Sequence, residues 1–323
     1  MANKKQHKFL HVTWYYIKTM SHNSSNKAVF AALSGNVLIA VSKYVVAFIT
    51  GSAGLLAEAV HSTADCLNQI FLLIGVKRSK KAKDEEHSMG YGREEFFWGL
   101  LVALFLFFVG ALFSLYEGFH KLSHPEPLSH VWLSLVVLGI SVIIEFTSFR
   151  IAYKEFKLTS KESFLPALKK SVAVNLIVIL LEDFAALIGL VFVLVTTLLS
   201  IYIPIFDAIG SILVGGLLLF VSYFMTNELR KLIVGESMNR ESCHRIKNIA
   251  QSFNNVKHVN KIQSMSMGRS QYMLLLSIDF EENVTSYDLE DTIEQIKIDV
   301  KKEFPEIDTF YIEAKDAVRN NRV

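Results

Sequence analysis

The chain contains very little cysteine, and the cysteines it has do not form a recognisable site. Only Cys66, inside a long apolar run, and Cys243, in a polar part of the chain, occur among 323 residues. Because no CxxC pair is present, the sequence predicts neither a disulfide framework nor a thiolate zinc finger. Residues 1–18 are basic but lack an apolar core followed by a cleavage site, so we expect no removable signal peptide.

Two further absences narrow the possible activities. No HExxH motif occurs, and the later apolar runs hold no histidine except His120 at an end. The residues that an intramembrane metalloprotease needs are therefore missing, and we predict that the chain is not an enzyme. Basic residues stand beside apolar runs, as membrane insertion alone requires, so nucleic-acid binding is not predicted either.

Charged residues are scarce along six stretches of the chain. Hydrophobic residues make up 51% of the sequence and the mean hydropathy is +0.34, which is too apolar for a soluble protein unless its charges are segregated. A helix of about 20 apolar residues crosses a hydrocarbon core of ~30 Å. We therefore predict an all-α transmembrane bundle of six helices, at residues 27–50, 52–76, 95–119, 131–152, 171–197 and 203–226.

Basic residues are concentrated in two of the loops between these runs. They are Lys77, Arg78, Lys80, Lys81, Lys83 and Arg93 in one loop, and Arg150, Lys154, Lys157, Lys161, Lys169 and Lys170 in the other. In the loops on the opposite side, the only lysine or arginine is Lys121. The positive-inside rule then predicts that both termini are cytoplasmic, with a basic arm at 1–26 and a transmembrane domain at 27–236. We expect a multi-pass protein that is surrounded by membrane lipid, in a cell (inner) membrane rather than in an organelle membrane.

The pattern changes after Lys231, where amphipathic segments replace the apolar runs. Helical periodicity covers 240–253 and 286–303, whereas 256–266, 271–281 and 307–315 are typical of strands, the first two strands being joined by a turn at 268–270. Pro305 ends the second helix. The order αββαβ predicts a small α+β ferredoxin-like cytoplasmic domain at 237–323.

The second apolar run carries four polar residues. Glu58, His61, Asp65 and Asn68 are separated by three, four and three positions, so they share one face of a helix. Ionisable residues inside a membrane usually face a partner or a polar path. His61 and Asp65 are one turn apart and can bind one metal ion together. A polar seam that only joins helices is the plainer alternative.

The fifth run contains an acidic pair near its middle. Asp183 lies at about the depth of His61 and Asp65, where the sites of transporters usually lie. Glu182 points about 100° away around the helix and either reaches the same ion or faces another helix. Asn175, two turns before Asp183 on the same face, can supply an amide oxygen.

Three other sets of charged residues have simpler explanations. Lys43 and Glu58 lie at similar distances from the tight Gly-Ser turn between the first two runs, so we expect a buried ion pair. Glu145 either pairs imperfectly with a nearby arginine or faces the bundle interior. Asp207 is expected near water at the outer end of the sixth run.

Five segments of the chain resemble the cation diffusion facilitator family. They are GSAGLLAEAVHSTAD (51–65), DEEHSMGYGREEFFW (84–98), LLEDFAALIG (180–189), DAIGSILVGGLLL (207–219) and LIVGES (232–237). The resemblance implies a homodimeric antiporter that exchanges a cytoplasmic divalent cation, usually zinc, for protons. It also implies a metal site of His61, Asp65 and Asp183, and a cytoplasmic domain that holds the two protomers together.

The fifth run departs from the family pattern HxxxD. Ile179 stands at the first position, and the sequence reads L-L-E-D at 180–183. This motif is similar to that of a branch of the family, in which a glutamate at the position of Glu182 accompanies the aspartate. A site richer in oxygen also suits manganese, iron or cobalt, so zinc is the first expectation and these metals are the alternatives. A non-transporting membrane sensor of the same fold is a further alternative.

A second site of the family uses the loop after the second helix. Asp84 and His87 match it and are weaker metal candidates, whereas Tyr91 replaces a histidine found in some members. In the C-terminal domain, Tyr311 stands where many members have histidine. No organic cofactor is expected.

Overall fold

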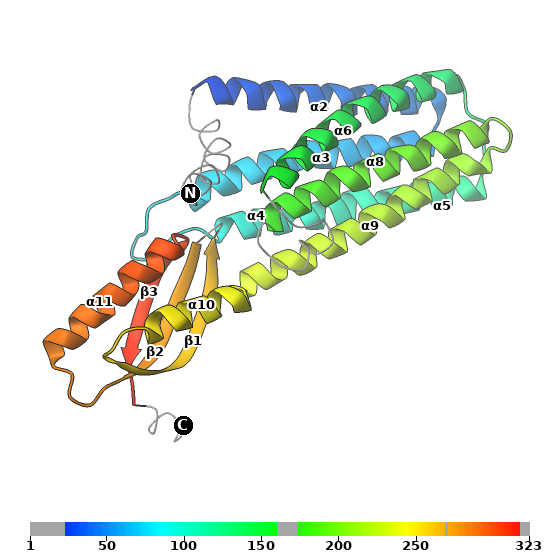
Figure 1. Cartoon of the computed structure of the whole chain (residues 1–323). Coiled ribbons are helices and arrows are strands. Elements are labelled where there is room, and N and C mark those ends of the chain that lie inside the picture. Colours follow the sequence, from blue (N-terminus) through cyan, green and yellow to red (C-terminus); the bar gives the residue numbers. More distant parts are fainter. Residues whose placement is uncertain (1–22, 160–173, 269–270, 317–323) are drawn as a thin grey trace. The chain divides into compact units, whose positions relative to one another are not determined.

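Six long helices make up most of the described part of the chain (Figure 1). The computed structural model describes residues 23–159, 174–268 and 271–316, with their side chains except at 23–32, 151–152, 155–159 and 174–182. The helices long and apolar enough to cross a membrane are α2 (Asn23–Thr50), α3 (Ala53–Ser79), α4 (Glu94–Phe105) continued by η1 (Leu106–Ala111) and α5 (Leu112–Ser123), α6 (Val131–Thr159), α8 (Val174–Ser200) and α9 (Ile205–Val234). Each overlaps one of the six predicted runs, and α6 and α9 extend beyond the predicted ends at 152 and 226. The predicted arm at 1–26 and turn at 268–270 fall largely outside the described residues.

The third span is interrupted, whereas the sequence predicted one continuous helix. A π-helical turn, η1, separates α4 from α5, and the N–H of Leu112 donates to the carbonyl of Phe107. A Cβ on Gly110 in this turn would lie 3.2 Å from Leu218 Cδ1 of α9. A π turn changes the hydrogen-bond pattern without changing the apolar composition, which is why composition did not reveal it.

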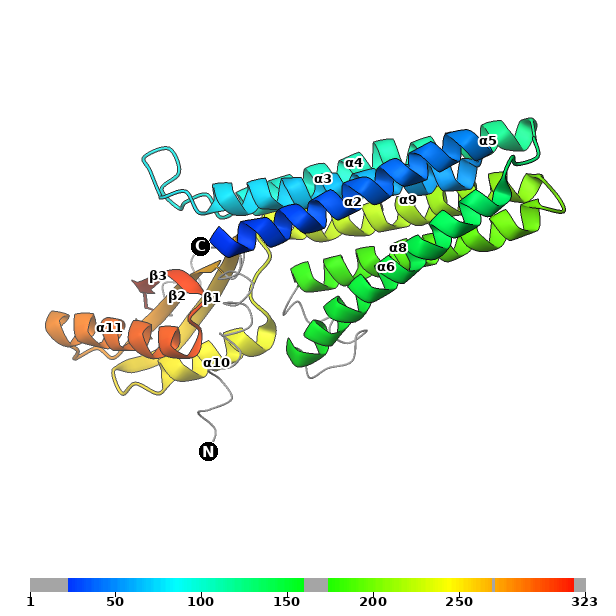
Figure 2. The ribbon, with the colours of Figure 1, turned by 90° about the horizontal axis from the view of Figure 1, so that it is seen from above.

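The described residues divide into two compact units. One consists of the described residues of Met1–Phe71 and Leu100–Thr226, and the other of those of Leu72–Gly99 and Asn227–Val323. In the first unit α6 packs beside both α2 and α8 (Figures 1 and 2). Helices α5 and α9 approach each other closely, because small residues allow membrane helices to do so.

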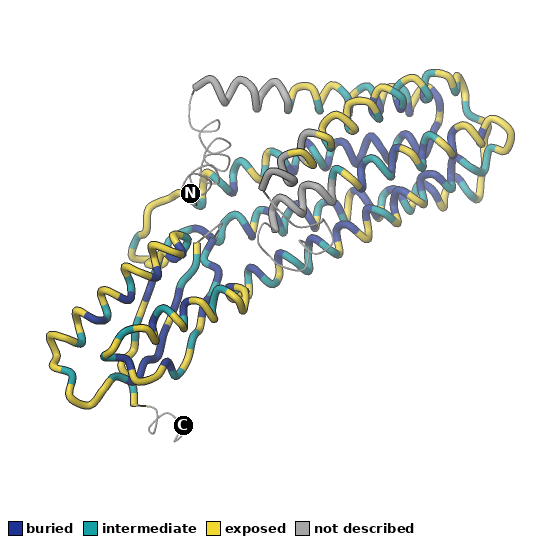
Figure 3. The backbone as a smooth tube through the Cα atoms, viewed as in Figure 1, coloured by how far each residue is buried: buried dark blue, intermediate teal, exposed yellow. Residues whose placement is uncertain are grey.

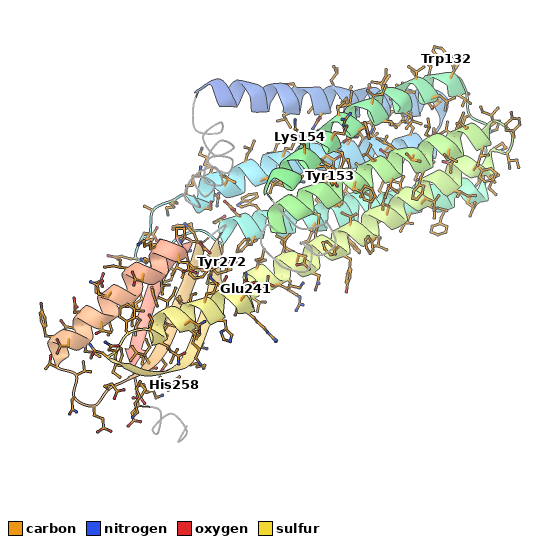
Figure 4. All side chains as sticks on the ribbon, in the orientation of Figure 1. Trp132, Tyr153, Lys154, Glu241, His258 and Tyr272 are labelled. Atoms are coloured by element: carbon orange, nitrogen blue, oxygen red, sulfur yellow. The ribbon has the colours of Figure 1, made fainter. Side chains whose placement is uncertain are left out.

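Aromatic residues lie near both ends of α6. Trp132, close to its beginning, is 62% exposed, and Tyr153 and Lys154 lie toward its other end (Figure 4). At about 1.5 Å per residue, Trp132 and Tyr153 are about 31 Å apart along the helix, which matches a hydrocarbon core of ~30 Å. Tryptophan and tyrosine are enriched at the two membrane–water interfaces, so α6 has the features of a complete span.

The second unit contains a three-stranded sheet with two helices packed on it (Figures 1 and 2). Its elements follow in the order α10 (Arg240–Gln251), β1 (Val256–Gly268), β2 (Gln271–Phe280), α11 (Ser286–Glu303) and β3 (Ile307–Ala314). The strand order is β1-β2-β3, with β1 antiparallel and β3 parallel to β2. Ile246, Leu276 and Ile296 are fully buried between sheet and helices. A small C-terminal sheet domain is present, and its ferredoxin-like classification stays a prediction.

The local sequence explains where the two helices of this unit begin. The Asn239 side chain accepts a hydrogen bond of 2.7 Å from the backbone N–H of Ser242 and caps α10. The Thr285 side chain accepts one of 3.2 Å from the backbone N–H of Asp288 and caps α11. Both caps satisfy N–H groups that have no partner within the helix.

We expect Gly118→Ala to destabilise the helix bundle and Gly139→Ala to leave it unchanged. A Cβ at position 118 of α5 would lie 2.6 Å from Ile212 Cγ1 of α9, whereas one at position 139 meets no described atom within 4 Å. Overpacking of this kind costs about 1–3 kcal/mol. Thermal unfolding of detergent-solubilised protein measures the difference, and equal melting temperatures for the two variants would contradict the close α5–α9 contact.

Candidate metal site

Much of α3 is buried inside the first unit (Figure 3), and so are the residues of its polar face except Asp65, whose side chain is 23% exposed. Glu58 is 0% and His61 4% exposed, and Asn68 is also buried. His61 Nε2 lies 3.8 Å from Asp65 Oδ2, one helical turn away. Alanines dominate the rest of this part of α3, so other helices can pack closely around the polar side chains. The structure therefore brings His61 and Asp65 together.

Three atoms on this face lack a hydrogen-bond partner among the described residues. They are Glu58 Oε1, His61 Nδ1 and Asp65 Oδ1, and all three are buried. Buried polar atoms in folded proteins are nearly always paired, because an unpaired one costs free energy. Carboxylate oxygens and unprotonated imidazole nitrogens donate electron pairs to metals, so this row of atoms suits a cation.

Helix α8 runs antiparallel to α3, and two close contacts show the register between them. A Cβ on Gly54 of α3 would lie 3.1 Å from Val193 Cγ1 of α8. A Cβ on Gly189 of α8 would lie 2.8 Å from Glu58 Oε1 of α3. Four residues forward along α3 therefore correspond to four residues back along α8.

Continuing this register places Asp65 level with residues 182–183 of α8. Asp183 is half-buried, and its carboxylate interacts electrostatically with that of Asp65. Among the described residues, however, no group of three metal-binding side chains converges on one point. The side chains of Glu182 and Asn175 lie outside the described residues, although both positions belong to α8.

Glu145 of α6 is a further acidic residue at this site. It interacts electrostatically with Asp65 and Asp183 as well as with His61. Of the two interpretations that the sequence left open, the structure favours the one in which Glu145 faces the bundle interior. A lone carboxylate within an apolar run was the signal in the sequence, and its direction depends on how α6 packs against α2 and α8.

The predicted ion pair between Lys43 of α2 and Glu58 of α3 is confirmed. Lys43 Nζ lies 3.2 Å from Glu58 Oε2 and donates a second hydrogen bond, of 2.8 Å, to Ser62 Oγ. Lys43 is 1% exposed, and its ammonium also interacts electrostatically with Asp65. The Lys43 side chain therefore stands beside the carboxylates of the candidate site.

Asp207 at the beginning of α9 was expected near water, and that expectation is wrong. Its side chain is fully buried. Its oxygens accept hydrogen bonds from Ser52 Oγ (2.5 Å), from the Ala53 N–H (2.7 Å) and from Lys121 Nζ (2.7 Å). The reason is that the N-terminus of α3 offers free N–H groups that attract a carboxylate. Asp207 therefore joins α3, α5 and α9, and both of its oxygens are engaged by the protein.

The loop after α3 contains the second pair of predicted candidates, Asp84 and His87. Asp84 accepts hydrogen bonds from the Tyr91 hydroxyl (2.6 Å), from Lys81 Nζ (2.9 Å) and from the backbone N–H of His87 (2.8 Å). The Tyr91 hydroxyl and then the Lys81 ammonium hold the pKa of this carboxyl well below its usual range. The His87 ring stacks on Tyr91 with 4.2 Å between the centroids. These contacts engage Asp84 within its own loop.

Comparison with known proteins relates the chain to transporters of metal cations. A family model described as the cation efflux transmembrane domain matches residues 29–234. The chain is 29% identical over 267 residues to the mitochondrial proton-coupled zinc antiporter SLC30A9 of Xenopus laevis, covering 80% of this chain and 47% of that protein. It is 29% identical over 262 residues to metal tolerance protein C4 of Arabidopsis thaliana, covering 79% and 57%. It is 26% identical over 259 residues to magnetosome protein MamB of a Magnetospira strain, covering 76% and 80%. The chain spans about half the length of the first two of these relatives.

We expect Lys121→Met to lower the free energy of unfolding by about 3–5 kcal/mol, because it leaves the Asp207 carboxylate buried without its cation. The double variant Lys121→Met/Asp207→Asn removes both charges and should recover most of the loss. Melting temperatures of the detergent-solubilised variants test this. An unchanged melting temperature for the single variant would show that the pair does not stabilise the bundle.

Proposed function

The chain belongs to the cation efflux family, and on that premise we propose that it carries a divalent metal cation across a membrane in exchange for protons. One observation supports this activity above the others. On α3, a row of buried oxygen and nitrogen atoms has no hydrogen-bond partner among the described residues, and the helix register places Asp65 at the level of residues 182–183 of α8. A polar row of this kind inside an apolar bundle is costly unless it serves an ion.

The chain is a multi-pass membrane protein, since six apolar helices and the family agree on this. We place both termini on the cytoplasmic side, because lysine and arginine are concentrated in the loops that share that side. The candidate site then lies near the middle of the bilayer, as in other transporters. A cell (inner) membrane stays the prediction for its location.

The proposed ligands are His61, Asp65 and Asp183, with Glu182 beside them on α8. A divalent cation in a poorly hydrated place needs compensating negative charge, which the carboxylates supply. Metal binds deprotonated carboxylates and neutral imidazole, so protons and metal compete for the same atoms. Competition at one site, combined with alternating access from the two sides, gives antiport without a separate proton path. In this scheme the metal leaves the cytoplasm as protons enter.

We propose zinc as the transported ion, as a substrate rather than a cofactor. An imidazole nitrogen combined with carboxylate oxygens is a common ligand set for zinc. The L-L-E-D sequence of α8, which we take to mark a branch of the family, replaces a second imidazole with oxygen. Manganese, iron and cobalt are therefore the alternatives.

We further propose that the C-terminal unit, of ferredoxin-like type, holds two copies of the chain together. Its sheet has a face away from the buried core, and this face carries Leu275, 38% exposed, and Tyr311, 54% exposed. Leu275 and Tyr311 are partners across β2 and β3, and Gln263 of β1 lies beside Leu275. An exposed apolar patch at the centre of a sheet suits a symmetric contact with a second copy.

Asp65→Ala and Asp183→Ala are each expected to abolish zinc-dependent proton movement in inverted vesicles, because the site loses charge that balances the cation. Both variants should still be expressed and inserted. The matched control is Glu117→Gln, which removes a half-buried carboxylate of α5 outside the site and should transport normally. Normal transport by both aspartate variants would remove the proposed site.

His61→Asp is expected to shift selectivity from zinc toward manganese. The substitution replaces the imidazole with an oxygen ligand, which manganese accepts more readily than zinc does. The ratio of the two transport rates in proteoliposomes measures the shift, and we expect a change on the order of tenfold, equivalent to about 1.4 kcal/mol. If the ratio stays as in the wild type, His61 is not a ligand.

A further inference from the structure

Lys43 places a cation where another cation is to be bound. It is 1% exposed, and its Nζ lies 3.2 Å from Glu58 Oε2 and 2.8 Å from Ser62 Oγ. Lysine is almost never fully buried unless it is paired. Glu58 supplies the pairing, yet Glu58 lies on the same face of α3 as His61 and Asp65.

The ion pair does not account for all the interactions of the two side chains. Glu58 Oε1 has no hydrogen-bond partner among the described residues. The ammonium of Lys43 acts electrostatically beyond Glu58, on His61 and on Asp65. Its second hydrogen bond, to Ser62, reaches toward Asp65, because positions 62 and 65 are neighbours on the helix surface. A flexible four-carbon side chain can move between such acceptors.

We propose that Lys43 is a tethered counter-ion of the metal site, and that Glu58 is the positioning residue that holds its ammonium away from the ligands. The inference rests on the proposed function, because it concerns how strongly His61, Asp65 and Asp183 hold their ion. The ammonium lowers the affinity of the site for every cation. After the metal leaves, it offsets part of the charge of Asp65 until protons or the next metal ion bind.

The charges around the site explain why such a residue is useful. The carboxylates of Glu58, Asp65, Glu145 and Asp183 interact with one another or with the same partners. Charges in a poorly hydrated place interact over several ångströms, so this set attracts a divalent cation strongly. A transport site must also release its ion, which requires binding that is not too tight. The Lys43 ammonium beside the site provides that limit.

Two single substitutions distinguish the counter-ion role of Lys43 from the alternative that the Lys43–Glu58 ion pair only joins α2 to α3. Lys43→Met removes the counter-ion, so zinc should bind about tenfold more tightly while the turnover of transport falls. Glu58→Gln frees the ammonium to approach Asp65, so zinc should bind about tenfold more weakly and KM should rise. A pair that only joins two helices predicts a loss of stability in both variants and no opposite shifts in affinity.

The dissociation constant of zinc is measured by titration calorimetry on the purified full chain, with KM and turnover measured in proteoliposomes. Lys43→Arg keeps the positive charge, so it should not show the tighter zinc binding that is expected of Lys43→Met. If Lys43→Met does not fold, Glu58→Gln and the charge-balanced double variant Lys43→Met/Glu58→Gln decide the question. The proposal requires the double variant to recover the affinity that Glu58→Gln loses, because the competing ammonium is gone.

Three results would overturn the role of Lys43: shifts of both single variants in the same direction, wild-type affinity in each, or a double variant as weak as Glu58→Gln. The last result would make Glu58 itself a zinc ligand. Asp65→Ala measured alongside separates this failure from failure of the proposed function. If Asp65→Ala still binds and transports zinc, the proposed metal site is wrong. If Asp65→Ala loses zinc binding and one of the three results is found as well, the metal site stands and only the role of Lys43 is wrong.

Discussion

The structure of the first unit depends on one constraint, which is that charged side chains taken out of water must be balanced inside an apolar bundle. Asp207, Lys121 and the beginning of α3 satisfy one another completely. Lys43 and Glu58 satisfy each other only in part. Burial of unbalanced charge is costly, so the place where balance is incomplete is the place where an ion is to be expected.

The two networks on α3 therefore have different roles, although both consist of buried acidic and basic groups. The network around Asp207 joins three helices with both carboxylate oxygens engaged. The one around His61 and Asp65 presents, along a single helix face, atoms that have no hydrogen-bond partner among the described residues. The antiparallel register with α8 brings an acidic pair to the level of that face. The chain belongs to the cation efflux family, and we propose on that basis that this face is the path of a divalent cation.

Much of the candidate site follows from spacing alone. Residues at i and i+4 of a helix are neighbours, so the contact of His61 with Asp65 required no tertiary information. Two spans joined by a tight turn are antiparallel neighbours, so Lys43 could be matched with Glu58 from their distances to that turn. The resemblance to a known family supplied Asp183, which the helix register places at the level of Asp65.

The sequence by itself determined the six apolar spans, the order of helices and strands in the C-terminal unit and the polar face of α3, because periodicity and composition depend only on neighbours along the chain. Tertiary structure alone decided that Asp207 is buried, that Glu145 turns inward, that Asp84 is engaged by Tyr91 and that the third span contains a π turn. Each of these depends on which faces of separate helices or which loop residues meet, and contacts between segments distant in sequence leave no periodic signal in either one.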